Sequence, residues 1–299
     1  MNLHPDDLDI LQTDPEFNSY LRKLHKIHKH STEVPEIAFG KRTTEVTQMM
    51  LGNTLVDFTY RVWLFSDSAV IFICNKCLFQ CHDSTAMGNH RHTCTGRIPG
   101  MCIYNDHVEN IAVVELDGEN QPILCRRICI IGKAFIERKT VYLDVKGYLF
   151  YVLIVDECFA GFFSKEKESS EHNLSCLLVL PMYRSKGYAI LLIDLSYILA
   201  PGSPEKPLSN QGQAVYRRYW KNKILLALKE FNGCEISIYE LSLASRLSVD
   251  DVICALEILN VDPRLLTYEI VQRRCDYLRM CKKEFLILGQ NVNNNNTQM

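Results

Sequence analysis

Three cysteines and one histidine have the spacing of a metal site. Two residues separate Cys74 from Cys77, twelve separate Cys77 from His90, and three separate His90 from Cys94. A tight turn brings the first two thiols together, and a His and a Cys one helical turn apart can complete a tetrahedron of the ligands that zinc prefers. With all four positions taken by protein, the expected Zn²⁺ is structural. The same segment holds other candidate ligands, so spacing alone leaves the assignment incomplete: Cys81, His82 and His92.

A second candidate site is a turn between an apolar run at Leu174–Leu180 and an apolar helix predicted at Gly187–Leu199. The first N–H groups of a helix and its dipole favour a bound pyrophosphate. Gly187 and Ala189 carry no bulky side chain, so phosphate oxygens can approach the backbone. Arg184 and Lys186 add positive charge, although either side chain could simply be solvated. The pattern alone is weak, and its place between strand and helix strengthens it.

The elements that must position these sites alternate between strands and helices, which predicts a mixed α/β fold. Pro201-Gly202 ends the predicted helix after the turn. Upstream, the apolar runs predict strands, a hairpin turned by Asp117-Gly118, and one helix. The predicted strands are Val62–Phe65, Ala69–Ile73, Ala112–Leu116, Ile123–Cys125, Val141–Val145 and Phe150–Val155, and the helix is Ile128–Arg138.

The C-terminal part is predicted to be helical, at Tyr216–Phe231, Ile238–Ser245 and Val249–Leu259. A short turn at Arg246–Ser248 separates the last two, as in a helix-turn-helix. Ser248 and the acidic residue three positions later form a start resembling a capping box. The last helix contains acidic residues but no Lys or Arg. Because phosphate contacts need cations, little direct DNA readout is expected.

Composition limits the classes of protein. The 299 residues are 47% hydrophobic and 23% charged, so the chain can bury a core, and its formal charge of −2 provides no overall attraction to nucleic acid. Met1–Phe17 is acidic without an apolar run, so no secretory signal is expected and the 13 cysteines should be reduced. The longest apolar stretch, Ile190–Ala200, is interrupted by Asp194, so no transmembrane helix is expected.

The chain resembles the catalytic domain of MYST-type histone acetyltransferases. The resemblance runs from about Ile37 to Leu288 and rests on the Cys-Cys-His-Cys finger and three further segments in order: Gly161–Ser169, Cys176–Pro181 and Gly202–Ser209. It implies a central acetyltransferase (GNAT-like) core, flanked by an N-terminal zinc-finger region and a C-terminal helix-turn-helix region.

The resemblance also implies roles for individual residues. Glu205 matches the general base, Cys176 the active-site cysteine proposed as an acetyl acceptor, and Lys133 the lysine that becomes autoacetylated. The positions that match contacts to acetyl-CoA are Leu177, Leu178, Val179, Arg184, Ser185, Lys186, Gly187, Tyr188, Ala189, Ile190 and Ser209.

Each of these roles has an alternative from the residues themselves. The lysine could attack acetyl-CoA directly, with Cys176 a packed thiol, or Cys176 could accept the acetyl group first; we favour direct attack. Glu205 could be a surface partner of Lys206, and Lys133 a solvated helix lysine.

The implied function is transfer of acetyl from acetyl-CoA to lysine ε-amines of core histone tails, foremost histone H4, an EC 2.3.1.48 type of activity. The implied setting is the nucleus, with nucleosomes and subunits of a chromatin-modifying complex as partners and no membrane contact. Two alternatives stay open: an acetyltransferase with mainly non-histone substrates, and a weakly active zinc-finger scaffold of a chromatin complex.

The predicted organisation has a polar, basic segment at 1–33, an acetyltransferase domain at 34–289 and a disordered polar tail at 290–299. Within the domain we expect the finger at about 69–94, the cofactor-binding core at about 100–200 and the helix-turn-helix region at about 201–289. The chain departs from the family in a shorter loop before Gly202 and at Met182, Ala189, Ile190, Asn210 and Arg218. These departures predict a weaker grip on the cofactor, and the chain is too short for an N-terminal chromo-like barrel, so targeting should depend on partner subunits.

Overall fold

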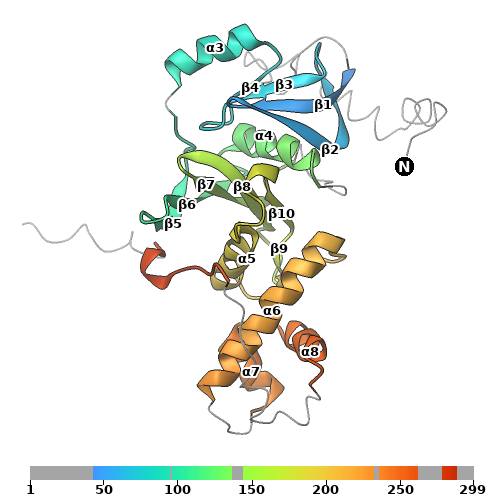
Figure 1. Ribbon diagram of the computed structural model, residues 1–299, viewed down its shortest axis with the longest axis vertical. Helices are drawn as coiled ribbons and strands as arrows, with labels where there is room; N and C mark the ends of the chain where they lie inside the picture. The colour runs from blue at the N-terminus through green and yellow to red at the C-terminus, as the bar shows by residue number, and fades with distance from the viewer. Residues whose placement is uncertain (1–42, 95, 137–143, 232–235, 262–277, 288–299) are drawn as a thin grey trace, which may run out of the picture.

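The computed structural model describes residues 43–94, 96–136, 144–231, 236–261 and 278–287. They form a mixed α/β fold built in layers, which confirms the predicted class (Figure 1). The predictions for segments 1–33 and 290–299, and most of the strand predicted at Val141–Val145, fall outside the described residues.

The N-terminal layer is a sheet of four strands in the order β2-β1-β3-β4. The strands are β1 (Thr43–Leu51), β2 (Thr54–Phe65), β3 (Val70–Ile73) and β4 (Gln80–Cys81). Helix α3 (Ser84–Thr93) follows β4 and begins at Asp83, whose carboxylate accepts the N–H groups of Thr85 and Ala86. This cap fixes where α3 starts.

The central layer is a five-stranded antiparallel sheet in the order β10-β8-β7-β6-β5. Its strands are β5 (Met101–Asp106), β6 (Ile111–Asp117), β7 (Tyr148–Val155), β8 (Cys158–Glu166) and β10 (Cys176–Val179). Side chains alternate between the faces, as strand geometry requires. Phe150, Val152 and Phe162 join the core shared with the N-terminal sheet, and Tyr151, Leu153 and Phe163 join the core shared with the C-terminal helices.

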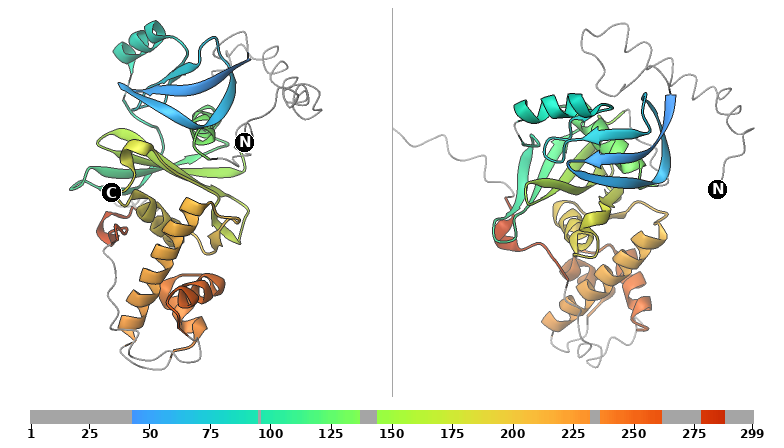
Figure 2. Two further views of the ribbon diagram at one scale, coloured as in Figure 1. Left: turned by 45° about the vertical axis from the view of Figure 1, so that its right-hand side comes forward. Right: turned by 45° about the horizontal axis from the view of Figure 1, so that its top comes forward.

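Helix α4 (Pro122–Lys133) packs between the N-terminal and central sheets (Figure 2). The predicted hairpin strand Ile123–Cys125 is therefore wrong, because these residues form the first turn of α4, with Pro122 at its start. Leu124, Ile128 and Ile131 are buried at helical spacing, so the apolar run belongs to one helix. Strand β6 pairs with β5 and β7, both antiparallel, and the turn at Asp117-Gly118 only ends β6.

Helix α5 (Tyr188–Leu199) packs against the opposite face of the central sheet, and helix α6 (Asn210–Glu230) packs against α5 (Figure 1). Helices α7 (Ile238–Ser245) and α8 (Val249–Ile258) pack against α6 and against each other, farther from the sheet. Helix α6 begins at Asn210 rather than at Tyr216, because Ser209 caps it by accepting the Gly212 N–H. The described part ends in a segment, Leu278–Ile287, that lies beside β5 and contains the short 3₁₀ helix η3 (Lys283–Phe285) (Figure 2).

Asp194 in α5 joins three of these elements. Its carboxylate accepts the Tyr219 hydroxyl from α6 at 2.9 Å and the Cys281 N–H from the C-terminal segment at 2.9 Å, and Lys223 lies 3.5 Å away. Asp194, which interrupts the apolar run, is thus a buried residue that links α5, α6 and the C-terminal segment.

Among the described helices, none is long and apolar enough to cross a membrane. All cysteines in the described ranges are free thiols.

Candidate functional site

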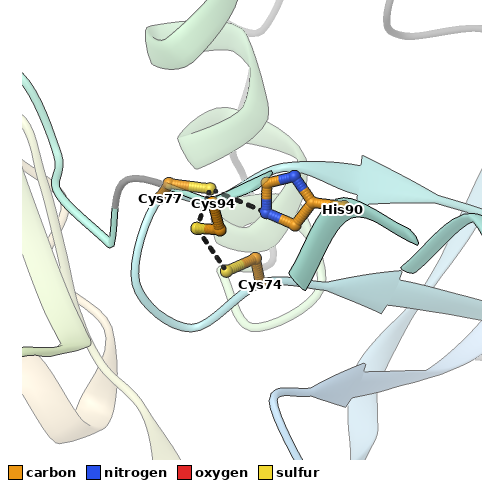
Figure 3. Close-up of side chains that lie close together, drawn as sticks. All are labelled: Cys74, Cys77, His90 and Cys94. Carbon is orange, nitrogen blue, oxygen red and sulfur yellow. Dashed lines mark hydrogen bonds between the residues drawn. The ribbon is translucent and has the colours of Figure 1, made fainter. Parts of the chain in front are cut away.

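The four predicted metal ligands converge in the structure (Figure 3). The Cys74 and Cys94 sulfurs are 3.7 Å apart, those of Cys77 and Cys94 are 3.5 Å apart, and the Cys77 sulfur lies 3.2 Å from His90 Nε2. All four ligand atoms lie within 4.8 Å of one another. The other candidates stand apart: Cys81 donates to the Asp83 carbonyl, and His82 and His92 are exposed.

The dimensions of the group fit a zinc ion. Zinc lies about 2.3 Å from sulfur and about 2.0 Å from histidine nitrogen, so a tetrahedron has sulfur–sulfur edges of about 3.8 Å and sulfur–nitrogen edges of about 3.5 Å. A hydrogen bond from the Cys77 thiol lowers the pKa of Cys74 to about 4, so the group already favours one thiolate. The Cys77–His90–Cys94 distances and this donor set therefore suit Zn²⁺ with four protein ligands.

Local structure explains how the ligands meet. Cys74 and Cys77 lie in the turn after β3, where the Leu78 N–H donates to the Cys74 carbonyl at 2.9 Å. His90 projects from the last turn of α3, and Cys94 follows that helix. The Phe79 ring stacks on the His90 imidazole with centroids 4.3 Å apart, which fixes the orientation of that ligand.

The cysteine turn also docks on the central sheet. The Phe159 N–H in β8 donates to the Asn75 carbonyl at 2.7 Å, and the Asn75 amide lies 3.0 Å from the Cys158 sulfur. Lys76 forms an exposed ion pair with Glu157 at 2.9 Å. The metal group therefore supports the turn between β7 and β8. It lies far along the chain from the second candidate site, the turn before α5.

The residues matched to the general base and the active-site cysteine are held by neighbouring short strands. Leu174 in β9 (His172–Leu174) pairs with β11 (Ser203–Pro204), and the Glu205 N–H donates to the Leu174 carbonyl at 2.8 Å. Cys176 begins β10 only two residues after Leu174. The run predicted as one strand, Leu174–Leu180, is thus divided at Ser175 between two pairings: β9 with β11, and β10 with β8.

Tyr148 is a further group near this pair that sequence reasoning missed. It begins β7, opposite Glu166 at the end of β8. Burial raises the pKa of the Tyr148 phenol, and the carboxylates of Glu166 and Glu205 and the Cys176 thiol raise it further. The Glu205 side chain is exposed and the Cys176 side chain is half-buried, so both can meet a solvent-borne substrate.

The predicted phosphate turn lies where expected, between β10 and α5. After the 3₁₀ turn η1 (Pro181–Tyr183), the side chains of Arg184, Ser185 and Lys186 are exposed. Gly187 adopts φ of +85° just before α5, a conformation that glycine tolerates best. The first N–H groups of α5 have no partner within the helix and can face an anion.

The side chains around this turn divide by burial. Those of Leu178, Tyr188 and Ile190 are buried, and those of Leu177, Val179 and Ala189 are half-buried. The buried side chains pack into the core, so these three residues can offer an anion only their backbone groups. Ser209 is exposed and caps α6, so it belongs to a different element from the turn before α5.

The C-terminal segment packs against the same turn through Arg279, which sequence reasoning also missed. Its guanidinium donates to the Lys186 carbonyl at 2.8 Å, lies 5.1 Å from the Tyr188 ring centroid and pairs with Glu109. A Cβ on Gly187 would lie 2.8 Å from the Arg279 Cβ. The turn is therefore held from outside by a residue 93 positions away.

Lys133 lies at the C-terminal end of α4 and is half-buried. Burial lowers the pKa of its ammonium group, because removal from water penalises the charged form. The structure therefore gives Lys133 a chemical environment different from that of a solvated helix lysine.

The family model that describes the MOZ/SAS family matches residues 97–289, which is more than half of the chain. The chain belongs to this family, and the resemblance to MYST-type acetyltransferases is confirmed.

Curated proteins similar to this chain are named histone acetyltransferases. The chain is 39% identical over 243 residues to "Histone acetyltransferase mst2" of Schizosaccharomyces pombe, covering 77% of this chain and 59% of the relative. It is 41% identical over 211 residues to "Histone acetyltransferase ESA1" of Gibberella zeae, covering 66% of this chain and 42% of the relative. It is 37% identical over 215 residues to the human "Histone acetyltransferase KAT6A", covering 68% of this chain and 11% of the relative. The chain thus spans less than two thirds of the length of each of these relatives.

Proposed function

We propose that this protein transfers the acetyl group of acetyl-CoA to lysine ε-amines of proteins, chiefly core histone tails. The observation that carries the proposal is that Glu205 directly follows β11, that β9, the partner of β11, ends two residues before Cys176, and that a helix-opening turn follows the other end of β10. Membership of the MOZ/SAS family and the names of the relatives support the same activity.

The proposed chemistry needs a base and a held cofactor. A lysine ammonium has a pKa of about 10.4 and cannot attack a thioester while protonated. Glu205 takes that proton, the free amine attacks the carbonyl carbon, the carbon–sulfur bond breaks, and coenzyme A leaves as a thiolate that is then protonated. The backbone of segment 184–190 binds the pyrophosphate, with Arg184 and Lys186 adding charge and Leu177–Val179 and Ser209 contacting the cofactor.

The proposed architecture follows the family. A GNAT-like core at about 100–200 binds the cofactor, a zinc-loaded finger at about 69–94 supports it, and a helix-turn-helix region at about 201–289, whose first segment carries Glu205, completes a domain that spans 34–289. The Cys74, Cys77, His90 and Cys94 group would hold the ion. The autoacetylated lysine is Lys133, where the lowered ammonium pKa favours the nucleophilic amine.

We further propose histone H4 as the preferred substrate, the nucleus as the site of action and a chromatin-modifying complex as the setting. The names of the relatives support a chromatin role. Helix α8 exposes Asp250 and Glu257 and contains no cation, which supports targeting by partner subunits instead of direct DNA readout.

The test is incubation of the zinc-loaded chain with acetyl-CoA and either nucleosomes, free core histones or a non-histone lysine peptide. Formation of acetyl-lysine is followed by mass spectrometry and release of coenzyme A by thiol assay. We expect acetyl-lysine on the H4 tail first. Acetylation of the non-histone peptide alone would show that the substrates are mainly non-histone proteins. Histone binding without any acetylation would support a scaffold role instead.

Cys176→Ser distinguishes the two routes of transfer. Under direct attack, the variant should keep kcat within about threefold of the wild type, because an interaction made only by packing contributes little to the transition state. Rapid-quench mass spectrometry of the wild type should then detect no acetyl group on Cys176. A kcat that falls by more than about a hundredfold, together with a trapped acetyl-thioester, would establish the covalent route.

A further inference from the structure

Glu205 directly follows strand β11, and β11 has few backbone contacts of its own. Strand β11 contains two residues, and its neighbours are held by the Ser203 N–H donating to the Glu171 carbonyl at 2.9 Å and by the Glu205 N–H donating to Leu174. The Asn173 amide donates to the Gly202 carbonyl at 3.2 Å. All of these contacts come from β9 and its preceding turn, which lie on one side of the segment.

A contact from another element completes the support. The Ser203 hydroxyl donates to one carboxylate oxygen of Asp251 in α8, at 2.7 Å and across 48 residues of sequence. The other oxygen accepts the Tyr197 hydroxyl from α5, also at 2.7 Å. Trp220 of α6 donates its indole N–H to the same Tyr197 hydroxyl at 2.9 Å. One buried carboxylate therefore ties β11 to three helices.

The surroundings of Asp251 compensate the burial of its carboxyl group. Asp251 is only 1% exposed, and it lies in the first turn of α8, whose N-terminal end stabilises negative charge. Burial and the carboxylate raise the pKa of the Tyr197 phenol, so Tyr197 stays a donor. Two hydroxyl donors and a helix end thus compensate the loss of water around Asp251.

We propose that Asp251 is a positioning residue for acetyl transfer, which through Ser203 fixes the segment that carries Glu205. The proposal rests on the proposed function of Glu205 as general base. Because the Glu205 side chain is exposed, few packing contacts fix it, and its position depends on the backbone that Ser203 and Asp251 hold. The C-terminal helices thereby act on the chemistry without touching the substrate.

The test compares Ser203→Ala, Asp251→Ala and their double variant in the full zinc-loaded chain. Since a misplaced catalytic group costs up to about a hundredfold, each single variant should lower kcat by about 10- to 100-fold. The dissociation constant of acetyl-CoA should stay unchanged, because the phosphate turn lies on other residues. The double variant should be no slower than the slower single variant, since both changes remove one interaction.

Tyr197→Phe is the matched control, because it removes the other hydrogen bond to the same carboxylate and leaves Ser203 in place. It should lower the melting temperature but change kcat by less than about threefold. Ser203→Thr, which keeps a hydroxyl, should restore kcat. Unchanged kcat in Ser203→Ala, additive losses in the double variant, or an equal loss in Tyr197→Phe would overturn the proposal.

Amide hydrogen exchange separates this inference from the proposed function. Ser203→Ala and Asp251→Ala should speed exchange at the Ser203 and Glu205 amides, and Tyr197→Phe should not. Unchanged exchange in the first two variants would overturn the positioning role whatever the activity. Absence of acetyl transfer by the wild type would instead overturn the proposed function and with it the catalytic consequence of Asp251.

Discussion

Glu205→Gln should lower kcat for acetylation of a lysine peptide by about 10²- to 10⁴-fold, the range that a general base contributes. The amide is almost the same size as the carboxylate and keeps the Glu205 N–H bond to Leu174, so the fold and the affinity for acetyl-CoA should not change. The effect should therefore lie in proton removal alone.

The pH dependence provides a sharper readout of the same variant. Without a base, the reaction needs substrate lysine that is already neutral, and its fraction rises about tenfold per pH unit below a pKa of about 10.4. The residual rate of Glu205→Gln should rise with that slope. Glu171→Gln, an exposed neighbour on the turn before β9, is the matched control and should behave as the wild type. Equal kcat in Glu205→Gln and wild type would remove Glu205 as the base.

Cys77→Ser should abolish stoichiometric zinc binding and unfold the N-terminal layer. Structural zinc contributes about 10–16 kcal/mol of apparent binding free energy in isolated fingers, which is comparable to the whole stability of a domain. Because the cysteine turn holds Phe159 and Cys158 through Asn75, the damage should spread to β8 and lower acetyl transfer as well. Zinc content by mass spectrometry and the melting temperature by circular dichroism measure both effects.

Cys81→Ser is the matched control for the zinc group. Cys81 lies between two of the zinc ligands along the chain and is buried, but it does not belong to the group of four ligands. Burial raises the pKa of its thiol. It should keep one zinc per chain. Full zinc content and an unchanged melting temperature in Cys77→Ser, or loss of zinc from Cys81→Ser, would show that the ligands are assigned wrongly.

The features predicted well from the sequence are those fixed by residues close together along the chain. The four metal ligands lie within 21 residues, and their spacing predicted the group that the structure brings together, although only the structure separates them from Cys81, His82 and His92. The turn before α5 was predicted from one glycine, two cations and the apolar runs on either side. Helix α7 begins and ends as predicted, and α8 ends one residue earlier at Ile258.

The errors arose where local pattern was ambiguous. Helix α3 was missed because it is polar and buries only Met87, so it has little apolar periodicity, although Asp83 was available as a capping signal. The apolar residues 123–125 suit a strand as well as a buried helix, and only their packing between two sheets decides. The division of Leu174–Leu180 depends on β11, a partner about 30 residues away.

Contacts between distant residues had no signal in a single sequence. Asp251 with Ser203, Arg279 with Lys186, and Asn75 with Phe159 each join segments far apart in the chain, and each pair consists of ordinary residue types. Such pairs are set by how the layers stack, so they appear only once the fold is known.

The central claim is that the turn before α5 and the pair Glu205 and Cys176 form one acetyl-transfer site. A crystal structure of the chain with bound acetyl-CoA tests it most directly. We predict pyrophosphate oxygens on the backbone N–H groups of segment 184–190, and the acetyl carbonyl beside Cys176 with Glu205 within reach of an incoming amine. A cofactor bound elsewhere, or an acetyl group remote from Glu205 and Cys176, would contradict the claim.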